Sequence, residues 1–298
     1  MNMNAHASLP SFAHGGVDTH AHVFEQGLPL TGDRRYAPAY DATLDNYLPL
    51  LNAHGMTHAV LVQPSFLGTD NRYLLQVLSA DTERLRGVAV VAPDISANEL
   101  DDLHRHCVTG VRLNLIEQPL PDLRARPWTS LLDHVARLDW HVELHRNAAD
   151  LAPLIDQLLE RGVRVVVDHF GRPDPALGTQ DQGFKALLGY GKTRRVWVKL
   201  SGAYRCTAPD SPFVADATRQ LIEQFGPDRL MWGSDWPHTQ YEAMTSYGDT
   251  LSTLLDAGLD STALGAILRT NARSFYGFDV ESVENASATT AAVQRATY

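Results

Sequence analysis

The chain has 298 residues, of which 44% are hydrophobic and 20% are charged, so it is long enough to bury one large core. Its formal net charge of −10 disfavours nucleic-acid binding, which normally needs a basic surface, and we expect no nucleic-acid partner. Cys107 and Cys206 fit no metal or redox spacing, and no apolar run reaches the roughly 18 residues of a membrane span. We therefore expect a cytoplasmic protein with no membrane contact.

Short β-branched segments alternate with longer amphipathic segments along most of the chain. The predicted strands cover residues 16–24, 58–64, 85–92, 110–115, 140–145, 164–170, 196–202 and 229–235. The predicted helices cover residues 44–54, 71–80, 96–107, 128–138, 150–161, 213–225 and 241–257, and a further helix covers 261–276. This alternation is typical of βα units around a parallel sheet, and eight units predict an α/β fold, the closed (β/α)8 TIM barrel.

The predicted barrel accounts for residues 15–278 as a single catalytic domain. The segments outside it are small and polar, and we expect residues 1–14 to be a flexible extension and residues 279–298 a mobile tail. Segment 25–43 is long for a connection between a strand and its helix, and it contains Tyr36. Such loops lie over the active-site end of a barrel, so this one is expected to form part of a lid or a substrate wall.

Two histidines end the first predicted strand, in Asp-Thr-His-Ala-His. Residues two apart on a strand point to the same face, so His20 and His22 project side by side. In a closed barrel the last strand returns beside the first, which brings Asp235 within reach of both imidazoles. A carboxylate among imidazoles is a site suited to activating water.

Other polar residues also interrupt the apolar pattern at predicted strand ends. Alternation in the fifth strand places Glu143 and His145 on its inner face, and Asp168 and His169 end the sixth strand. Functional residues of a barrel gather at these ends, so we expect His169 to join the catalytic group of His20, His22 and Asp235. A single histidine at a strand end is more often structural. Two imidazoles that both face the barrel interior lose hydration, so this pair favours a functional interpretation.

The cluster can work chemically in two ways. With one divalent ion, zinc or manganese, the ligands would be His20, His22, His145 and Asp235, with one position left for water. With no cofactor, the imidazoles can donate hydrogen bonds to a carbonyl oxygen while Asp235 acts as general base on water. Both schemes hydrolyse an activated carbonyl, and the sequence leaves the choice between them open.

Arginines and polar side chains near the same ends predict an anionic small-molecule substrate. Arg112 and Asn114 alternate onto the inner face of the fourth strand, and Arg205 follows the seventh. Guanidinium groups suit carboxylates through paired hydrogen bonds, although a surface salt bridge would also explain Arg205. Ser65 and Tyr36 are weaker candidates for polar contacts with the substrate.

The motifs DTHAHVF, RRYAP, GTDNR, TGVRLN, WHVELH, VVVDHFGRPD and RLMWGSDWPHT follow one another in an order that resembles the amidohydrolase superfamily. Within it the chain is most similar to the lactonases that open 2-pyrone-4,6-dicarboxylate. The resemblance implies a lactone hydrolase of aromatic-compound breakdown.

By position, the resemblance implies that His20, His22 and His169 polarise the lactone carbonyl and that Asp235 activates water. It further implies that Arg112, Arg205 and Tyr36 hold the substrate. The chain departs from these lactonases in two places, since Gln118 replaces an arginine and His145 replaces a tyrosine. Gln118 removes an arginine that would recognise a second carboxylate of the substrate. His145 favours a bound metal ion.

Three alternatives remain open from the sequence. A metal-dependent decarboxylase of an aromatic or muconate-type acid would use a similar ligand set. A barrel that binds a small acid without turnover is the non-enzyme alternative. Assembly into a homo-oligomer is compatible with everything in the sequence.

Overall fold

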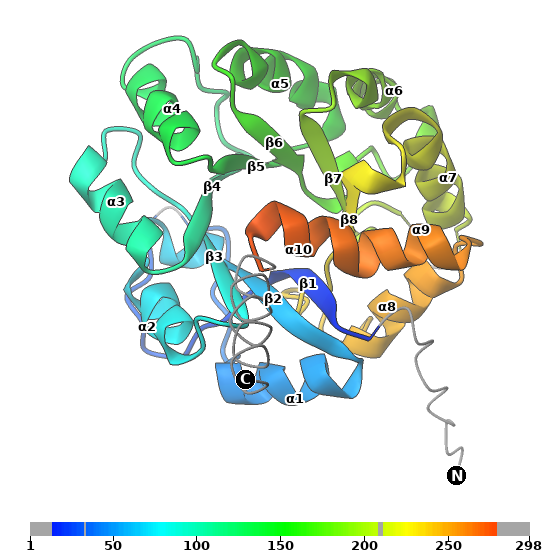
Figure 1. The fold of residues 1–298 in the computed structure, drawn as a ribbon, viewed down its shortest axis with the longest axis horizontal. Helices are drawn as coiled ribbons and strands as arrows, with labels where there is room; N and C mark the ends of the chain where they lie inside the picture. The colour runs from blue at the N-terminus through cyan, green and yellow to red at the C-terminus, as the bar shows by residue number, and fades with distance from the viewer. Residues whose placement is uncertain (1–13, 33, 208–210, 279–298) are drawn as a thin grey trace, which may run out of the picture.

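Eight parallel strands form the centre of the computed structural model, which describes residues 14–32, 34–207 and 211–278. Each strand pairs with its neighbour in chain order, and the helices lie around them (Figure 1). The strands are β1 (Gly16–Ala21), β2 (Met56–Val62), β3 (Leu85–Ala89), β4 (Val108–Asn114), β5 (His141–His145), β6 (Arg164–Val167), β7 (Val196–Leu200) and β8 (Leu230–Trp232). The predicted (β/α)8 barrel is confirmed.

The barrel closes where β8 meets β1. The Asp235 backbone N–H donates to the His20 carbonyl at 2.8 Å, and the His22 N–H donates to the Trp236 carbonyl at 2.8 Å. A parallel bridge joins Ala21 to Trp236, and the Thr19 hydroxyl donates to the Trp232 carbonyl at 2.7 Å. Backbone hydrogen bonds therefore hold the end of the last strand against the end of the first.

The helices cover the outside of the barrel with their apolar faces. Thr43, Ser96 and Ser246 each begin a helix with a capping box, in which the hydroxyl and the side chain three residues later satisfy backbone N–H groups. The helices are α1 (Leu44–Ala53), α2 (Arg72–Ala80), α3 (Ala97–Arg105), α4 (Trp128–Arg137), α5 (Leu151–Glu160), α6 (Gln182–Leu188), α7 (Phe213–Phe225), α8 (Tyr247–Leu255), α9 (Ser261–Gly265) and α10 (Asn271–Tyr276). None of these described helices has the length and apolar character needed to cross a membrane.

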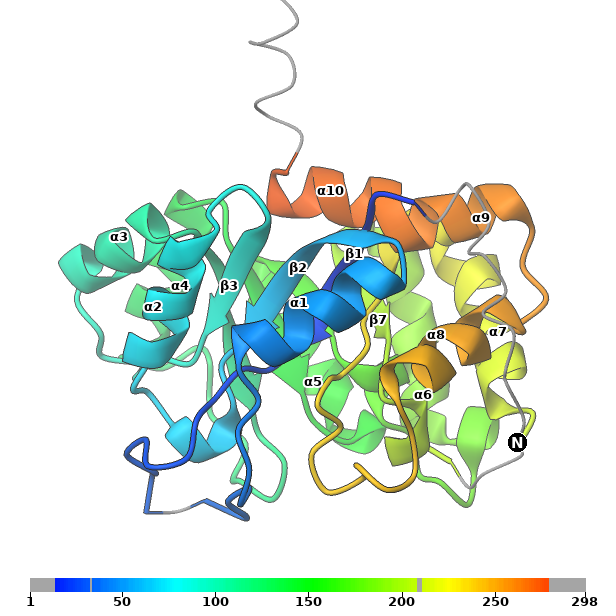
Figure 2. The ribbon, with the colours of Figure 1, turned by 90° about the horizontal axis from the view of Figure 1, so that it is seen from below.

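Alternation along the strands divides the core into two parts. On β2, Ala59 and Leu61 pack toward the helices, whereas Val60 and Val62 belong to a smaller cluster that also holds Tyr276. Helix α10 lies across the end of the barrel where the strands begin (Figures 1 and 2). That end is therefore filled and covered by apolar side chains, which leaves the opposite end for polar chemistry.

The structure differs from the sequence expectations in the limits of several elements. Most predicted strands run one to three residues too far, because residues such as His22 and His169 already belong to the loops. The predicted helix 241–257 begins only at Tyr247, and the helix predicted over 261–276 is interrupted by a π-helical segment, Ala266–Thr270. Helix α6 was not among the predicted helices. The predicted extension 1–14, His14 apart, and the predicted tail 279–298 lie outside the described residues.

Candidate active site

A polar cavity opens at the carboxyl ends of the strands, the end opposite α10. Nine of the ten site residues expected from the sequence line it, and His20 lies directly beneath, fully buried. The nine are His22, Tyr36, Ser65, Arg112, Asn114, His145, His169, Arg205 and Asp235. Closure of the barrel thus brings together side chains from both ends of the sequence.

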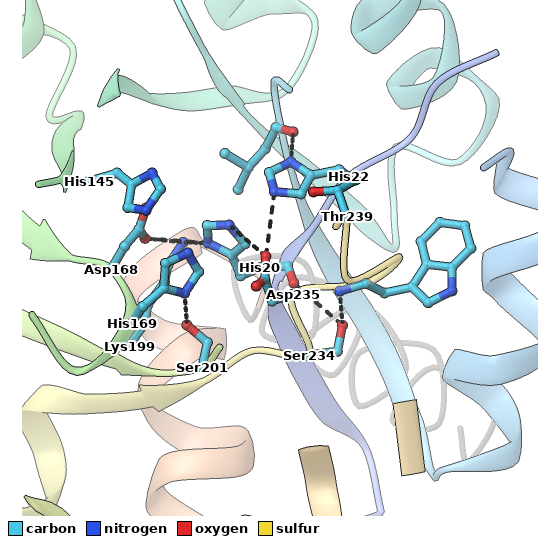
Figure 3. A network of polar contacts seen from close by, with 12 residues as sticks. His20, His22, His145, Asp168, His169, Lys199, Ser201, Ser234, Asp235 and Thr239 are labelled. Atoms are coloured by element: carbon cyan, nitrogen blue, oxygen red, sulfur yellow. Dashed lines mark hydrogen bonds and ion pairs between the residues drawn. The ribbon is translucent and has the colours of Figure 1, made fainter. Parts of the chain in front are cut away.

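His20 and His22 share one carboxylate oxygen, as Figure 3 shows. Asp235 Oδ1 lies 3.8 Å from His20 Nε2 and 3.7 Å from His22 Nε2. His22 Nδ1 lies 2.7 Å from the Val62 carbonyl, which can only accept, so the neutral ring carries its proton on Nδ1. In that tautomer the Nε2 lone pair of His22 faces a carboxylate oxygen 3.7 Å away, an arrangement that a cation between the two atoms would satisfy.

These donors fit a divalent ion in type and spacing. Ligand atoms of His20, His22 and Asp235 all lie within 4.8 Å of one another, and His20 Nε2 is buried without a hydrogen-bond partner in the described structure. Two imidazole nitrogens and one carboxylate suit zinc or a similar metal. His145, the fourth ligand expected from the sequence, does not join this group, because its Nε2 faces Arg172 Nη1 at 3.3 Å.

Contacts to the second oxygen of Asp235, Oδ2, favour its ionised form. Oδ2 accepts a hydrogen bond from the Tyr204 hydroxyl at 2.6 Å and one from Arg205 Nε at 2.6 Å. Burial by itself raises the pKa of Asp235, but the charge of Arg205 opposes this effect, and the pKa of Asp235 lies well below its usual range. Arg205 therefore forms a buried ion pair inside the cavity, not a surface salt bridge.

His169 stands on the other side of His20, and the centres of their rings are 4.8 Å apart. Its Nδ1 lies 2.9 Å from the Ser201 hydroxyl, which fixes the plane of the ring. Burial lowers the pKa of His169 to about 3, so this imidazole is neutral near pH 7 and faces the cavity as an uncharged group.

A network of buried charges supports His20 from below. Lys199 on β7 contacts Glu143 on β5 and lies 3.2 Å from His20 Nδ1. Asp168 Oδ1 lies 3.3 Å from the same nitrogen. Arg112 donates to Asp168 Oδ2 through Nε at 3.0 Å and Nη2 at 2.8 Å. Two cations and two carboxylates thus balance one another where no water reaches.

This network changes the interpretation of Arg112 and reveals residues that the sequence analysis missed. Arg112 lines the cavity as expected, but its Nε and Nη2 donate to Asp168 and its Nε also lies 3.3 Å from Glu143 Oε1, so Nη1 is the nitrogen without an acceptor in the described structure. Lys199 was missed, although its place two residues after Trp197 on one face of β7 marks it as inward. Tyr204, whose hydroxyl contacts Asp235, was also missed.

Arg172 is the most informative residue that the sequence analysis did not select. It follows His169 in Gly-Arg-Pro-Asp, adopts a left-handed backbone (φ 47°) and lines the cavity beside His145. Within the described part of the chain no carboxylate pairs with it, and burial lowers the pKa of its guanidinium. It is a desolvated cation that faces the cavity without an anion.

The long loop after β1 forms one wall, as expected. Arg35 and Tyr36 line the cavity, and the Tyr36 hydroxyl lies 2.9 Å from the hydroxyl of Thr239, beyond β8. The Tyr36 ring packs on Phe66, with ring centres 5.5 Å apart. The loop is thus joined to both sides of the cavity mouth.

Comparison with known proteins places this barrel in a family. The amidohydrolase family model matches residues 17–278. The chain is 34% identical over 249 residues to 2-pyrone-4,6-dicarboxylate hydrolase of Comamonas testosteroni, covering 78% of this chain and 81% of the relative. It is 30% identical over 271 residues to 4-sulfomuconolactone hydrolase of Hydrogenophaga intermedia, covering 88% and 89%.

A solved structure agrees with these relatives. A Pseudomonas putida protein with the provisional name 2-pyrone-4,6-dicarboxylic acid hydrolase superposes with a TM-score of 0.84 at 46% identity, covering 90% of this chain and 99% of that one. The family match spans the strands and the loops that carry the cavity residues. The chain belongs to the amidohydrolase family.

Proposed function

We propose that this protein hydrolyses the lactone ring of a small carboxylated substrate, 2-pyrone-4,6-dicarboxylate or a close analogue. The observation that carries the proposal is the ionised Asp235 between two imidazoles, in a cavity that also holds arginines. The named relatives that act on 2-pyrone-4,6-dicarboxylate and on 4-sulfomuconolactone support the same chemistry.

Asp235 is the proposed general base. A water molecule beside Oδ1 would give its proton to the carboxylate as its oxygen attacks the lactone carbonyl carbon. Tyr204 and Arg205 hold Oδ2, so the carboxylate keeps one orientation throughout. When the ring C–O bond breaks, the same proton passes to the departing ring oxygen, which becomes a hydroxyl. The second proton of the water stays on the new carboxyl group and is released to solvent as that group ionises.

His20 and His169 are proposed to stabilise the carbonyl oxygen directly, whereas His22, whose proton lies on Nδ1, would act through a bound divalent ion. Their rings surround the position next to Asp235, and negative charge develops on that oxygen during attack. A divalent ion held by His20, His22 and Asp235 would, when bound, polarise the carbonyl and acidify the water. His169 remains neutral in either case and can donate from the ring nitrogen that Ser201 does not occupy.

The arginines are proposed to bind the carboxylates of the substrate. Arg172 is desolvated and unpaired with any described acid, so a substrate carboxylate would supply its missing anion. Arg112 Nη1, Arg205 and the hydroxyls of Tyr36 and Ser65 line the same cavity, and Asn114 and His145 complete its wall. Both cysteines are free, which supports action in the reducing cytoplasm.

The test is the loss of ultraviolet absorbance of 2-pyrone-4,6-dicarboxylate with the purified protein, compared with the Asp235→Asn variant. We expect turnover by the native protein and a loss of at least about 10²-fold in the variant, since a base is removed with little change in volume. Equal activity in both proteins would refute the role of Asp235. Release of carbon dioxide without ring hydrolysis would instead establish the decarboxylase alternative.

A further inference from the structure

Lys199 contacts the His20 ring on the side away from Asp235. Its Nζ lies 3.2 Å from His20 Nδ1 and also contacts Glu143 Oε2, and all three side chains are fully buried. Asp235 lies on the other side of the ring, 3.8 Å from Nε2 (Figure 3). The two nitrogens of His20 thus have different surroundings, since Nδ1 faces the buried charges and Nε2 faces the proposed base.

The contact with Lys199 determines which nitrogen of His20 carries the proton. An ammonium group has three donors and no acceptor, so Lys199 can only donate to the lone pair of His20 Nδ1. A neutral imidazole with a lone pair on Nδ1 carries its proton on Nε2. A doubly protonated ring would direct an N–H at the ammonium, so the same contact disfavours that form.

Asp168 is the competing partner of the same nitrogen. Its Oδ1 lies 3.3 Å from His20 Nδ1 and could accept a proton from it, but this oxygen has no hydrogen-bond partner in the described structure. The carboxylate is held through Oδ2, to which Arg112 donates from Nε and Nη2. The geometry therefore favours donation by Lys199 over acceptance by Asp168.

His22 holds its proton on the opposite nitrogen, because its Nδ1 faces the Val62 carbonyl at 2.7 Å. His20 and His22 therefore present unlike atoms to Asp235, an Nε2–H and an Nε2 lone pair. His20 Nε2 has no hydrogen-bond partner among the described residues, and its distance of 3.8 Å from Asp235 Oδ1 is too long for a hydrogen bond. Its proton can therefore be donated to an oxygen atom of a ligand.

We infer that Lys199 is a positioning residue for the proposed lactone hydrolysis, on which this inference rests. By donating to His20 Nδ1, it holds the proton of His20 on Nε2, where the imidazole can donate to the carbonyl oxygen of the lactone. In this tautomer His20 has no Nε2 lone pair for a metal ion. A divalent ion held by His20, His22 and Asp235 would require the proton to move to Nδ1, against the ammonium. Lys199 thus favours use of the site without a metal ion.

The first experiment reads both tautomers in the native protein. Long-range proton–nitrogen NMR spectra of protein labelled in its histidines distinguish a ring nitrogen that carries hydrogen from one that does not, and His20→Asn and His22→Asn assign the signals. We expect the proton on Nε2 in His20 and on Nδ1 in His22, which serves as the internal control. A proton on Nδ1 of His20 would overturn the inference, and no substrate is needed to see it.

The double variant Lys199→Met with Glu143→Leu tests whether Lys199 is the cause. It removes both charges of the pair and leaves Asp168 Oδ1, 3.3 Å away, as a partner of His20 Nδ1. We therefore expect the proton to move to Nδ1 in His20 and to stay in place in His22. Glu143→Gln keeps the ammonium and is the matched control, in which both tautomers should be unchanged. An unchanged His20 tautomer in the double variant would overturn the role of Lys199.

Zinc affinity is a second measurement that needs no substrate. Calorimetric titration of the chelator-treated proteins should show that the double variant binds Zn²⁺ about tenfold more tightly than the native protein, because His20 Nε2 gains a lone pair while the net charge stays the same. Equal affinities would contradict the exclusion of a metal ion by Lys199.

Steady-state kinetics in metal-free buffer connect the tautomer to the reaction. The double variant should lose about 10²-fold in kcat for 2-pyrone-4,6-dicarboxylate with KM nearly unchanged, since a donor to the carbonyl oxygen is removed. An unchanged kcat would show that Lys199 does not position His20 for hydrolysis. The expected tautomers and zinc affinities without turnover by the native protein would refute the proposed function alone.

Discussion

Arg205 donates through Nε to Asp235 Oδ2 at 2.6 Å, and the pair is buried within the cavity. The guanidinium also lies over the rings of Tyr204 and Tyr241, which limits its movement. Arg205 is therefore tied to the proposed base and cannot act only as a substrate clamp.

This pairing gives the first prediction. Arg205→Ala should lower kcat by about 10²-fold as well as raise KM, because Asp235 loses the donor that fixes its orientation. Arg205→Lys should recover only part of kcat, since an ammonium lacks the planar fork of the guanidinium. Steady-state kinetics on a carboxylated and an uncharged lactone are the measurement, and a change in KM alone would contradict this role.

The second prediction concerns Arg172, the cation without a described carboxylate partner. Arg172→Gln should raise KM for a carboxylated lactone by about 10- to 100-fold and leave kcat nearly unchanged, because a charge-assisted hydrogen bond to the substrate is lost. An uncharged lactone serves as the control, and its KM should stay the same. If both substrates suffered equally, Arg172 would have a structural role only.

The third prediction concerns the buried Lys199 and Glu143 pair. Lys199→Met should lower the free energy of unfolding by about 3–5 kcal/mol, because the buried Glu143 would keep only Arg112, which it shares with Asp168, as its cation. The double variant Lys199→Met with Glu143→Leu should recover much of that loss, since no isolated charge remains. Urea unfolding of both single variants and the double variant measures the coupling. Additive losses would show that the two side chains act independently.

Acid sensitivity is the fourth prediction. Burial holds the pKa values of His20, His141, His145 and His169 below the usual value of 6.5. The unfolded chain then binds more protons than the native one, so stability is full above pH 6.5 and falls as the pH decreases toward 3. Each such histidine adds up to about 1.4 kcal/mol per pH unit to the slope.

His141 allows that prediction to be tested away from the cavity. Its ring packs against Phe275 and Tyr276 at the apolar end, with ring centres 5.1 Å and 5.5 Å away. His141→Leu should reduce the slope of the unfolding free energy against pH, between pH 6.5 and 4, by up to about 1.4 kcal/mol per pH unit. Parallel curves for variant and native protein would show that His141 does not contribute.

The sequence was enough to predict the barrel and the meeting of His20 with Asp235. Period-two alternation marks which strand residues face inward. In a closed eight-stranded barrel, the last strand must pair with the first. The same alternation put Arg112 and Glu143 each on the inner face of its strand, and the two residues are register partners on β4 and β5.

Sequence patterns could not predict which groups the side chains of the site contact. Arg112 donates to Asp168, and Arg172 contacts His145, because of loop conformations beyond the strands. Arg172 lies in a left-handed turn whose direction no periodicity describes. Gln118, a departure noted in the sequence, does not line the candidate active-site cavity, because the loop after β4 carries it away from there.

The backbone hydrogen bonds between His20, His22, Asp235 and Trp236 join residues that lie more than two hundred positions apart. A fragment that lacks either end of the barrel therefore cannot bring the proposed base and all of its imidazoles together. Loops of this length close late during folding, because their ends must meet at a large entropic cost. Activity should consequently appear only in the last phase of refolding, after most helices have formed, and can serve as a chemical reporter of barrel closure.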